Sequence, residues 1–421
     1  MSVFVKATAS RSRPLKSILG GAAIVGVSAL VLSGCAAPAD TGGGASAGPR
    51  EPIALKIGTI LPQSGTLAFL GPPEEAGVAL AVKEINAANL DITVDVQYRD
   101  SGDTTTDTAT VSVTDLLSQN VTAIVGAASS GVSKTVIDQI TGAGVIQFSP
   151  ANTSIDFSDY ADDGLYWRTA PSDVLQGEVL GNLIADDGAA NVGIIELNDS
   201  YGTGLAKSLK ENFEAAGGKV VAESLYNTGE TVFTTQVAEI TAANPDAVAL
   251  ITFEEAKVIV PALRGAGYAG PLYLVDGNLA DYSADFAAGT LKGAKGTLPG
   301  LDTAKLGDFT DRLLKVDPSL KDYSYAAESY DAVVLIALAA LAANSVDGKT
   351  VAAKLQEVSG GSGKGTKCTT FEECAKIIID GGVADYDGNS GPISFDKNGD
   401  PTEATIGIYQ YDDANKYSRI N

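Results

Sequence analysis

The sequence predicts an α/β fold with two lobes, each built on a doubly wound and mainly parallel sheet. Three observations lead to this fold class. From residue 53 onward, short runs rich in valine and isoleucine alternate with segments of helical spacing, which is typical of βαβ units. Roughly 370 residues follow the first fifty, more than one hydrophobic core normally holds. Two segments, 92–126 and 219–252, also look like copies of each other.

The expected strands are short and apolar. Their ranges are 53–61, 92–98, 122–126, 145–149, 191–197, 219–226, 246–252 and 271–275. The segments between them, such as 74–88 and 204–216, have the spacing of amphipathic helices. The apolar run 333–343 is too short to cross a bilayer, so it predicts a buried helix.

The two similar segments carry the same features in the same order. Each has a strand that ends in a tyrosine, Tyr98 or Tyr226, followed by a polar turn, an amphipathic helix and a second strand. Two copies indicate two lobes of similar topology rather than a solenoid. A chance similarity between two βαβ units is the alternative.

Residues 1–34 have the composition of an export signal. Four basic residues and no acidic one stand within the first 16 positions, and a short apolar stretch follows. The sequence Leu32-Ser33-Gly34-Cys35 resembles the cleavage box of bacterial lipoproteins, which implies cleavage before Cys35 and attachment of lipid to it. An ordinary secretory signal with an incidental cysteine is the alternative.

Residues 35–52 are rich in alanine, glycine, serine and proline and lack a periodic apolar pattern. This composition predicts a flexible tether. The expected location is the outer face of the cell membrane, with the chain held there by its lipid.

The remaining cysteines support the same compartment. Cys368 and Cys374 stand close together in KCTTFEEC, and outside the cytoplasm such a pair oxidises readily, so we expect a disulfide. Five intervening residues fit neither a CxxC redox motif nor a four-ligand zinc set.

The charge balance and the missing histidine narrow the function. The chain has 52 acidic and 29 basic residues, which argues against a nucleic-acid partner. It has no histidine, so Ser-His-Asp and Cys-His catalysis are excluded, together with most zinc chemistry. We expect no cofactor and no metal, and a binding protein rather than an enzyme.

Several motifs in succession carry a resemblance to a known family. They are KIGTILPQSG with EEAGVALAVKEINAAN, then VTAIVGAASSGVSKTVIDQITGAGVIQFSPANTS, DSYGTGLAKSLKENFEAAGGKVV, SYAAESYDAVVLIALA and YDGNSGPISFDKNGDP. In this order they resemble the type I periplasmic-binding-protein family, in particular the branched-chain amino acid (Leu/Ile/Val) subfamily of ABC importers.

The resemblance implies two lobes joined by three hinge crossings, with the ligand in the cleft between them. Lobe 1 would comprise residues 53–172 and 301–390, and lobe 2 residues 173–300 and 391–421. The acidic and glycine-rich segment 387–400 would be a hinge crossing and hairpin. It lacks the ligand spacing that an EF-hand calcium loop requires.

In lobe 1 the resemblance places ligand contacts on three loops. Ser130 begins the helix after GAAS, where free amides and the helix dipole favour a carboxylate; a plain N-cap role is the alternative. Ala151 and Thr153 in SPANTS would hold the α-carboxylate and α-ammonium, although Thr153 could instead cap the turn. Leu70, beside Phe69, falls at the side-chain pocket.

In lobe 2 the resemblance points to Tyr201, Phe253 and Asp276. Tyr201 in NDSYGTG would close on the ligand backbone, and Asp276 in YLVDGN would face the ammonium, since a desolvated cation needs an anion. Asp276 could equally be a turn residue before glycine. Phe253 stands where the family often has a tyrosine, so one hydroxyl is missing. Glu254 follows it, either to supply another polar contact or to begin the next helix.

The remaining side-chain pocket falls near Ala327 and Glu328 by the same resemblance. The implied function is capture of a small amino-acid-like ligand, such as a branched-chain or other aliphatic amino acid, and its delivery to an ABC permease. The chain is expected to act as a monomer. The alternatives are a sensory module, a receptor for short amides, urea or small carboxylates, and an enzyme that uses carboxylates alone.

Overall fold

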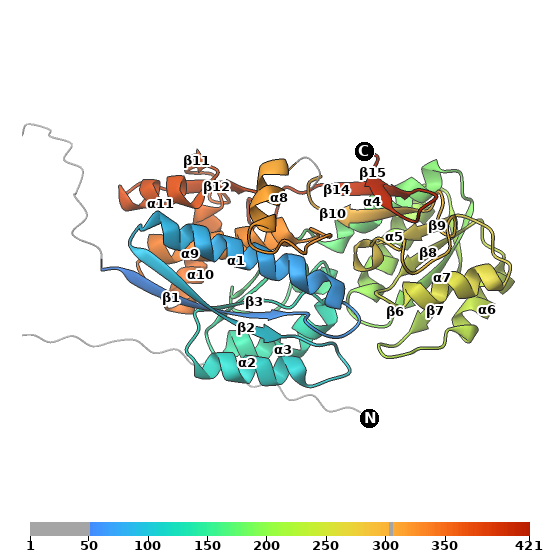
Figure 1. The fold of residues 1–421 in the computed structure, drawn as a ribbon, viewed down its shortest axis with the longest axis horizontal. Helices are drawn as coiled ribbons and strands as arrows, with labels where there is room; N and C mark the ends of the chain where they lie inside the picture. The colour runs from blue at the N-terminus through green and yellow to red at the C-terminus, as the bar shows by residue number, and fades with distance from the viewer. Residues whose placement is uncertain (1–50, 303–305) are drawn as a thin grey trace, which may run out of the picture. The chain divides into compact units, whose positions relative to one another are not determined.

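The computed structural model describes residues 51–302 and 306–421 (Figure 1). The predicted signal peptide, Cys35 and nearly all of the predicted tether therefore lie outside the described residues. The described part of the chain forms three sheets.

The first sheet is entirely parallel. Its strands are β1 (Ile53–Leu61), β2 (Ile92–Asp100), β3 (Ala123–Gly126), β4 (Ile146–Ser149) and β5 (Tyr166–Arg168). They pair in the order β2-β1-β3-β4-β5. We call this sheet, with the helices that pack on it, lobe 1.

The second sheet repeats the same order and adds two antiparallel strands. Its strands are β6 (Asn191–Leu197), β7 (Lys219–Tyr226), β8 (Ala247–Ile251), β9 (Leu272–Leu274), β10 (Lys295–Pro299), β14 (Ile406–Tyr411) and β15 (Tyr417–Arg419). The order is β7-β6-β8-β9-β10, followed by β14 and β15. We call this sheet, with its helices, lobe 2.

The two similar sequence segments occupy equivalent places in these sheets. Residues 92–126 form β2, α2 (Thr108–Ser118) and β3, and residues 219–252 form β7, α6 (Thr234–Ala243) and β8. In the first sheet β2 lies on one side of β1 and β3 on the other. In the second sheet β7 lies on one side of β6 and β8 on the other. The chain therefore reverses its direction of strand addition once in each lobe, beside β1 and beside β6.

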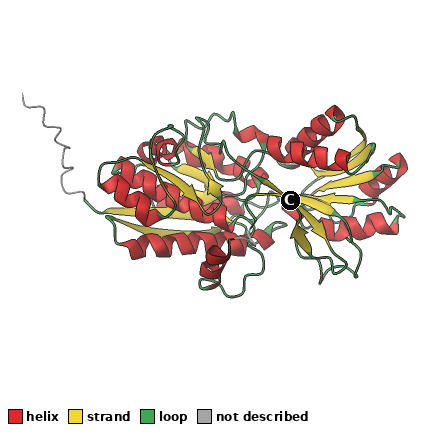
Figure 2. Ribbon diagram, turned by 90° about the horizontal axis from the view of Figure 1, so that it is seen from above, coloured by secondary structure: helices red, strands yellow, loops and turns green. Residues whose placement is uncertain are grey.

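Helices cover both faces of the sheets (Figure 2). In lobe 1, α2 and α3 (Ser130–Gly142) pack on one face, and α1 (Gly71–Ala88) packs with α9 (Ala326–Ala343) on the other. Consecutive residues Ile124 and Val125 of β3 accordingly point into clusters on opposite faces, as the alternation of a strand requires.

Among the described residues, lobe 2 has four α-helices, and lobe 1 has three besides α1, α2, α3 and α9. In lobe 2 they are α4 (Asp173–Asp186), α5 (Gly202–Ala215), α6 and α7 (Ala256–Gly265); in lobe 1 they are α8 (Gly307–Leu314), α10 (Gly348–Val358) and α11 (Phe371–Ile379). Ile393 and Phe395 belong to the core of lobe 1, so the last crossing into lobe 2 lies beyond Phe395.

Helix α9 contains the apolar run that the sequence singled out. Among the described residues it is the one helix long and apolar enough to cross a membrane, but 89% of that stretch is buried inside the protein. It packs against α1, α10 and α11. The prediction of a buried core helix is confirmed.

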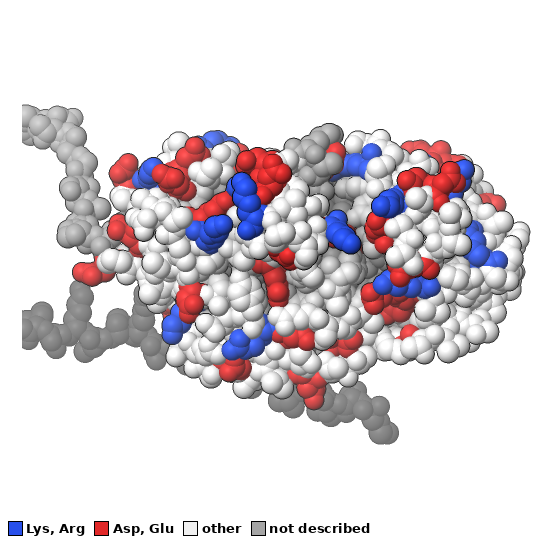
Figure 3. Space-filling view, viewed as in Figure 1, with Lys and Arg blue, Asp and Glu red and all other residues white. Residues whose placement is uncertain are grey.

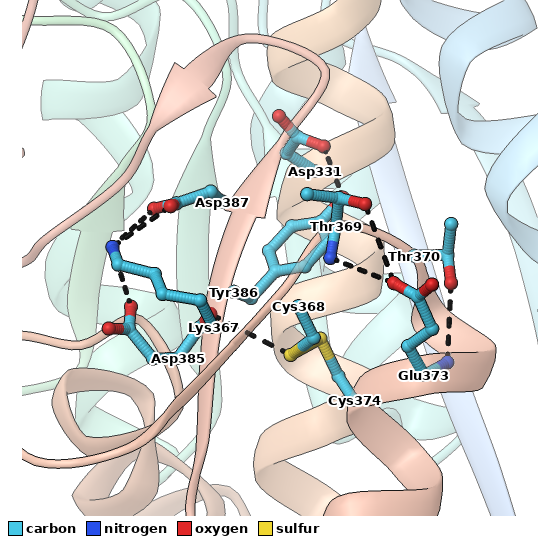
Figure 4. Close-up of a disulfide and its surroundings, with 10 residues drawn as sticks. All are labelled: Asp331, Lys367, Cys368, Thr369, Thr370, Glu373, Cys374, Asp385, Tyr386 and Asp387. Carbon is cyan, nitrogen blue, oxygen red and sulfur yellow. Dashed lines mark hydrogen bonds and ion pairs between the residues drawn. A yellow bond between two sulfur atoms is a disulfide. The ribbon is translucent and has the colours of Figure 1, made fainter.

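The third, small sheet carries the disulfide. It contains β11 (Thr366–Cys368), β12 (Ala384–Gly388) and β13 (Gly391–Pro392). Cys368 at the end of β11 is bonded to Cys374 in α11, with a Cα–Cα distance of 5.4 Å (Figure 4). Thr370 caps α11 by accepting a hydrogen bond from Glu373 N. The predicted pairing of the two cysteines is confirmed.

Acidic side chains outnumber basic ones on the face seen in Figure 3, and the two kinds are interspersed. Several basic groups there and elsewhere are paired, such as Lys210 with Glu223 at 2.8 Å and Lys292 with Asp413 at 2.9 Å. That face has no broad basic patch of the kind that phosphate binding needs.

Candidate functional site

A cavity lies where the loops of the two lobes meet. It is lined by Leu67, Leu70, Ala128, Ser129, Ser130, Ala151, Tyr201, Phe253, Asp276, Gly277 and Tyr325. Apart from Tyr325, these residues follow the carboxyl ends of β1, β3 and β4 in lobe 1 and of β6, β8 and β9 in lobe 2. In open α/β sheets this edge, beside the point where strand order reverses, is the usual ligand site.

Most of the predicted site residues meet in this cavity. Ser130, Ala151, Leu70, Tyr201, Phe253 and Asp276 all line it, whereas Thr153 does not. Thr153 is buried beside it, and its carbonyl accepts a hydrogen bond from Asp173 N at 2.7 Å. Its hydroxyl has no hydrogen-bond partner among the described residues.

Asp276 is the charged group of the cavity. It opens the 3₁₀ turn η3 (Asp276–Asn278) after β9 and is 5% exposed. Its Oδ1 accepts hydrogen bonds from Tyr201 Oη at 2.6 Å and Gln176 Nε2 at 3.0 Å, and its Oδ2 accepts one from Tyr325 Oη at 2.8 Å.

Asp276 therefore has neutral donors around it. It takes part in none of the ion pairs found in the described part of the chain. Burial raises the pKa of its carboxyl, while the hydrogen bonds from the two tyrosines and Gln176 lower it. A buried carboxylate without a cationic partner is suited to bind the cationic group of a ligand.

The start of α3 forms the part of the cavity that favours an anion, in contrast to the Asp276 carboxylate. Ser129 is the N-cap, and its side chain accepts a hydrogen bond from Val132 N at 3.3 Å. Ser130 is the first helical residue, so the capping role considered for it belongs to Ser129. The hydroxyl oxygen of Ser130 accepts from Ser154 N at 3.3 Å, which leaves its proton free to be donated to an anion. The helix dipole adds to this preference for negative charge.

The loop after β4 is held rigidly at the cavity. Ser149 Oγ accepts from Ala151 N and Asn152 N, and Asn152 Nδ2 donates to the carbonyls of Ala127 and Ala128 at 3.0 and 2.7 Å. These bonds tie the loops after β3 and β4 together, so Ala151 and Ser130 keep a fixed relation.

Two stacked rings form the lobe 2 wall. The rings of Tyr201 and Phe253 lie with centroids 5.4 Å apart and planes at 16°. Asp199 Oδ1 fixes the turn before α5 by accepting from Tyr201 N, and Glu255 Oε2 accepts from Phe253 N. Phe253 has no hydroxyl to contribute, as the sequence indicated, and Glu254 does not line this cavity; its side chain pairs with Lys257 at 2.8 Å.

Tyr325 and Gln176 were missed by sequence reasoning. Tyr325 precedes α9 with φ of 58° and reaches Asp276 from lobe 1. The sequence pointed to Ala327 and Glu328 instead, but neither lines the cavity, and Ala327 packs in the lobe 1 core. The available signal was the tyrosine two residues earlier in SYAAES.

The lobes touch around the cavity. Glu254 N donates to Thr66 O at 3.2 Å, Ser154 Oγ to Ser200 O at 2.8 Å, and Thr104 Oγ1 to Thr228 Oγ1 at 3.0 Å. The cavity is narrow, about 10 Å³, which is about the space that one water occupies. A larger ligand requires the lobes or the lining side chains to move apart.

Comparisons with known proteins agree with this geometry. Residues 54–378 match the family model described as periplasmic binding protein. The Leu/Ile/Val-binding protein homolog 1 of Brucella suis is 26% identical, over 85% of this chain and 90% of its own. The chemotactic signal transduction system substrate-binding protein BasB of Halobacterium salinarum is 26% identical, over 86% and 87%. Among solved structures, the substrate-binding protein LivJ of Streptococcus pneumoniae, in complex with isoleucine, has a TM-score of 0.70 and 24% identity, over 87% of this chain and 100% of its own.

Proposed function

The chain belongs to the periplasmic binding protein family, and we propose that it captures an amino acid or close analogue between its lobes and delivers it to an ABC importer. The family is one of solute-binding proteins, so the function is binding and transport rather than catalysis. The observation that carries the ligand class is the cavity itself, with the Asp276 carboxylate on one side and the start of α3 on the other.

An amino acid matches both ends of this cavity. Its ammonium would bind Asp276 Oδ2, beside or in place of the Tyr325 hydroxyl. Its carboxylate would lie at the start of α3, where the Ser130 hydroxyl and the first helical amides donate hydrogen bonds. Ala151 and Thr153 would contact these groups from the loop after β4. Such contacts hold only the backbone of an amino acid and leave its side chain open; relatives named for leucine, isoleucine and valine favour an aliphatic one.

Ligand capture would proceed by closure. In our proposal residues 53–172 and 301–395 move as one body, and residues 173–300 and the chain beyond Phe395 move as the other. The expected boundary at residue 390 is shifted because Ile393 and Phe395 pack in the lobe 1 core. The ligand first contacts Ser130 and Ala151, and lobe 2 then brings in Tyr201, Phe253 and Asp276. Because the ligand bridges both lobes only when they are closed, it stabilises that state and shifts the population towards it.

We also propose that the protein acts as a monomer anchored by lipid on Cys35 at the outer face of the cell membrane. The support is the cleavage box and the tether composition of residues 35–52. Mass spectrometry of the membrane-extracted protein tests the anchor. A mature chain that begins at Cys35 and carries acyl mass is expected; the same chain without added mass would contradict the anchor.

A sensory role is a second candidate, since BasB, the chemotactic relative from Halobacterium salinarum, is as similar as the Brucella protein. The cavity serves either role. Deleting the gene and measuring uptake of the bound ligand separates them: lost uptake supports transport, and intact uptake with a lost behavioural or transcriptional response supports sensing.

Titration calorimetry tests the proposed function. The chain from residue 36 onward is unfolded and refolded to remove bound ligand, then titrated with L-leucine, L-isoleucine, L-valine, L-alanine, urea, acetamide and benzoate. Saturable binding of at least one amino acid is expected. Binding of amides or carboxylates alone would support a solute receptor and contradict an amino acid as its ligand.

A further inference from the structure

A second cavity lies in the same cleft. It has a volume of about 140 Å³, against about 10 Å³ for the first. Phe69 of lobe 1 lines one side, and residues that follow β8 and β9 of lobe 2 line the rest, among them Phe253, Glu254, Lys257 and Tyr282. Phe69 packs against the hydrophobic core of lobe 2, so this cavity too forms where the lobes meet.

The two cavities adjoin at one shared residue. Phe253 lines both of them. Leu70 and Gly277 of the first cavity are chain neighbours of Phe69 and Asn278 of the second. A ligand side chain that extends from the first cavity past Phe253 would therefore reach the second.

The Phe253 ring is held by packing alone. It stacks on Tyr201 and lies close to Gly277, where an added Cβ would come within 2.7 Å of the ring. Since phenylalanine has no polar ring atom, rotation of this side chain breaks no hydrogen bond. A tyrosine at the same position would bring a hydroxyl that needs a partner when buried.

The second cavity combines aromatic surface with excess negative charge. Phe69, Phe253 and Tyr282 supply the rings, and Glu254, Asp281 and Asp285 supply carboxylates. Lys257 Nζ lies 2.8 Å from Glu254 Oε1 and 3.9 Å from Asp285 Oδ1, and Lys416 Nζ lies 3.6 Å from Asp281 Oδ2. Three carboxylates thus face two ammonium groups.

We infer that the second cavity is the side-chain subsite of the cleft and that it selects a long side chain with an apolar stem and a cationic end. The stem packs on the rings of Phe253 and Phe69, and the cationic end balances the third carboxylate. This inference rests on the proposed function, in which Asp276 and the start of α3 hold the amino acid backbone. It replaces the aliphatic side chain that the names of the relatives favour with one that ends in a cation.

Three probes of graded length test the subsite by calorimetry. L-Lysine and L-norleucine share a four-carbon stem and differ in the terminal ammonium, and L-alanine is too short to pass Phe253. Lysine is expected to bind at least tenfold more tightly than norleucine. In Glu254→Gln and in Asp285→Asn its affinity is expected to fall about five- to tenfold while that of alanine stays within twofold. Asp413→Asn, which removes an exposed charge of lobe 2 outside the cavity, is expected to change neither.

Two outcomes overturn the inference and differ in what they say about the proposed function. If alanine or leucine binds and norleucine binds as tightly as lysine, the cationic subsite is wrong and the amino acid receptor stands. If no amino acid binds, the proposed function fails and the subsite fails with it.

Discussion

The Tyr325 hydroxyl of lobe 1 donates a hydrogen bond of 2.8 Å to Asp276 Oδ2 of lobe 2. The carboxylate that would receive the ligand's ammonium is therefore already a point of contact between the lobes. Tyr201 and Gln176, both on the lobe 2 side, hold its other oxygen at 2.6 and 3.0 Å. This arrangement fixes the orientation of the carboxylate, and in the proposed function it would couple ligand binding to closure.

Tyr325→Phe is expected to weaken amino acid binding about tenfold. The variant removes a hydrogen bond to a charged group, worth about 1.5–3 kcal/mol, from the closed state while the open state loses little. Calorimetry measures the affinity, and small-angle scattering measures the fraction of closed molecules. Tighter binding by the variant would mean that the hydroxyl competes with the ligand rather than supporting closure.

Ser130→Ala and Ser129→Ala are expected to act differently although the residues are adjacent. Ser130→Ala removes the proposed carboxylate donor, so affinity should fall about tenfold with little change in Tm. Ser129→Ala removes the N-cap of α3 and should cost about 1 kcal/mol of stability. Thermal unfolding and calorimetry on both variants check this, and the reverse pattern would contradict the assignment.

Ligand binding is expected to release protons from Asp173. This residue is fully buried, and neither of its carboxylate oxygens has a hydrogen-bond partner among the described residues. Desolvation and then the charge of Asp276 raise its pKa well above the usual range. The nearby Thr153 hydroxyl and the charge of Arg168 oppose this rise, and Asp199 adds to it. An ammonium bound at Asp276 favours ionisation of Asp173, so affinity should rise with pH until the free protein's Asp173 has ionised.

Calorimetry in buffers of different ionisation enthalpy measures that proton release. Asp173→Asn should abolish it and leave saturable binding in place. Equal proton release by the variant and the native protein would show that another group releases the proton. The other titratable groups near Asp173 and Asp276 are Asp199, Tyr201 and Tyr325.

Stability is expected to fall as pH rises from about 5 to 8, because of Glu328. Burial raises the pKa of this carboxyl to about 8, and the buried Glu74 lies near it. Between the ordinary pKa of glutamate and 8 the folded state holds a proton that the unfolded state has lost, so the free energy of unfolding decreases by at most about 1.4 kcal/mol per pH unit for one group.

Glu328→Gln should reduce this pH dependence and raise Tm at pH 8. The exposed Glu372→Gln is the matched control and should leave the slope unchanged. Denaturant unfolding at pH 5, 6.5 and 8 gives the slope of the unfolding free energy against pH for the native protein and for the two variants. A slope in Glu328→Gln equal to that of the native protein would contradict the raised pKa of Glu328. The other buried carboxyls with raised pKa values, such as Glu74 and Asp173, contribute to the slope of both proteins.

The loops that follow strands could be predicted from the sequence because the signal is local. An apolar run such as 122–126 followed by serines and a helical pattern places Ser130 at a strand end, and parallel strands bring such ends together. The family resemblance selected Ala151, Tyr201, Phe253 and Asp276 on such loops, and all four line the cavity, whereas Thr153, selected in the same way, does not. Their contacts with a ligand remain predictions.

Tyr325 and Gln176 could not be predicted because their roles depend on tertiary contacts. Tyr325 reaches the cavity from the loop between α8 and α9, and no periodicity sets which residue there points inward. Gln176 lies inside α4, where a buried glutamine looks like any polar helix residue. The short strands β5 and β10 were also missed; β10, Lys-Gly-Thr-Leu-Pro, contains glycine and proline, which strand propensities disfavour.

The most direct test of the proposed function is calorimetric titration of the refolded native protein and of Asp276→Asn with the amino acid that binds most tightly. The asparagine keeps the shape of the side chain and removes the charge that would pair with the ammonium. A loss of affinity of at least 100-fold, with Asp413→Asn unchanged, is expected. Binding by Asp276→Asn within threefold of the native protein would contradict the role of Asp276 and with it the assignment of the cavity as an amino acid site.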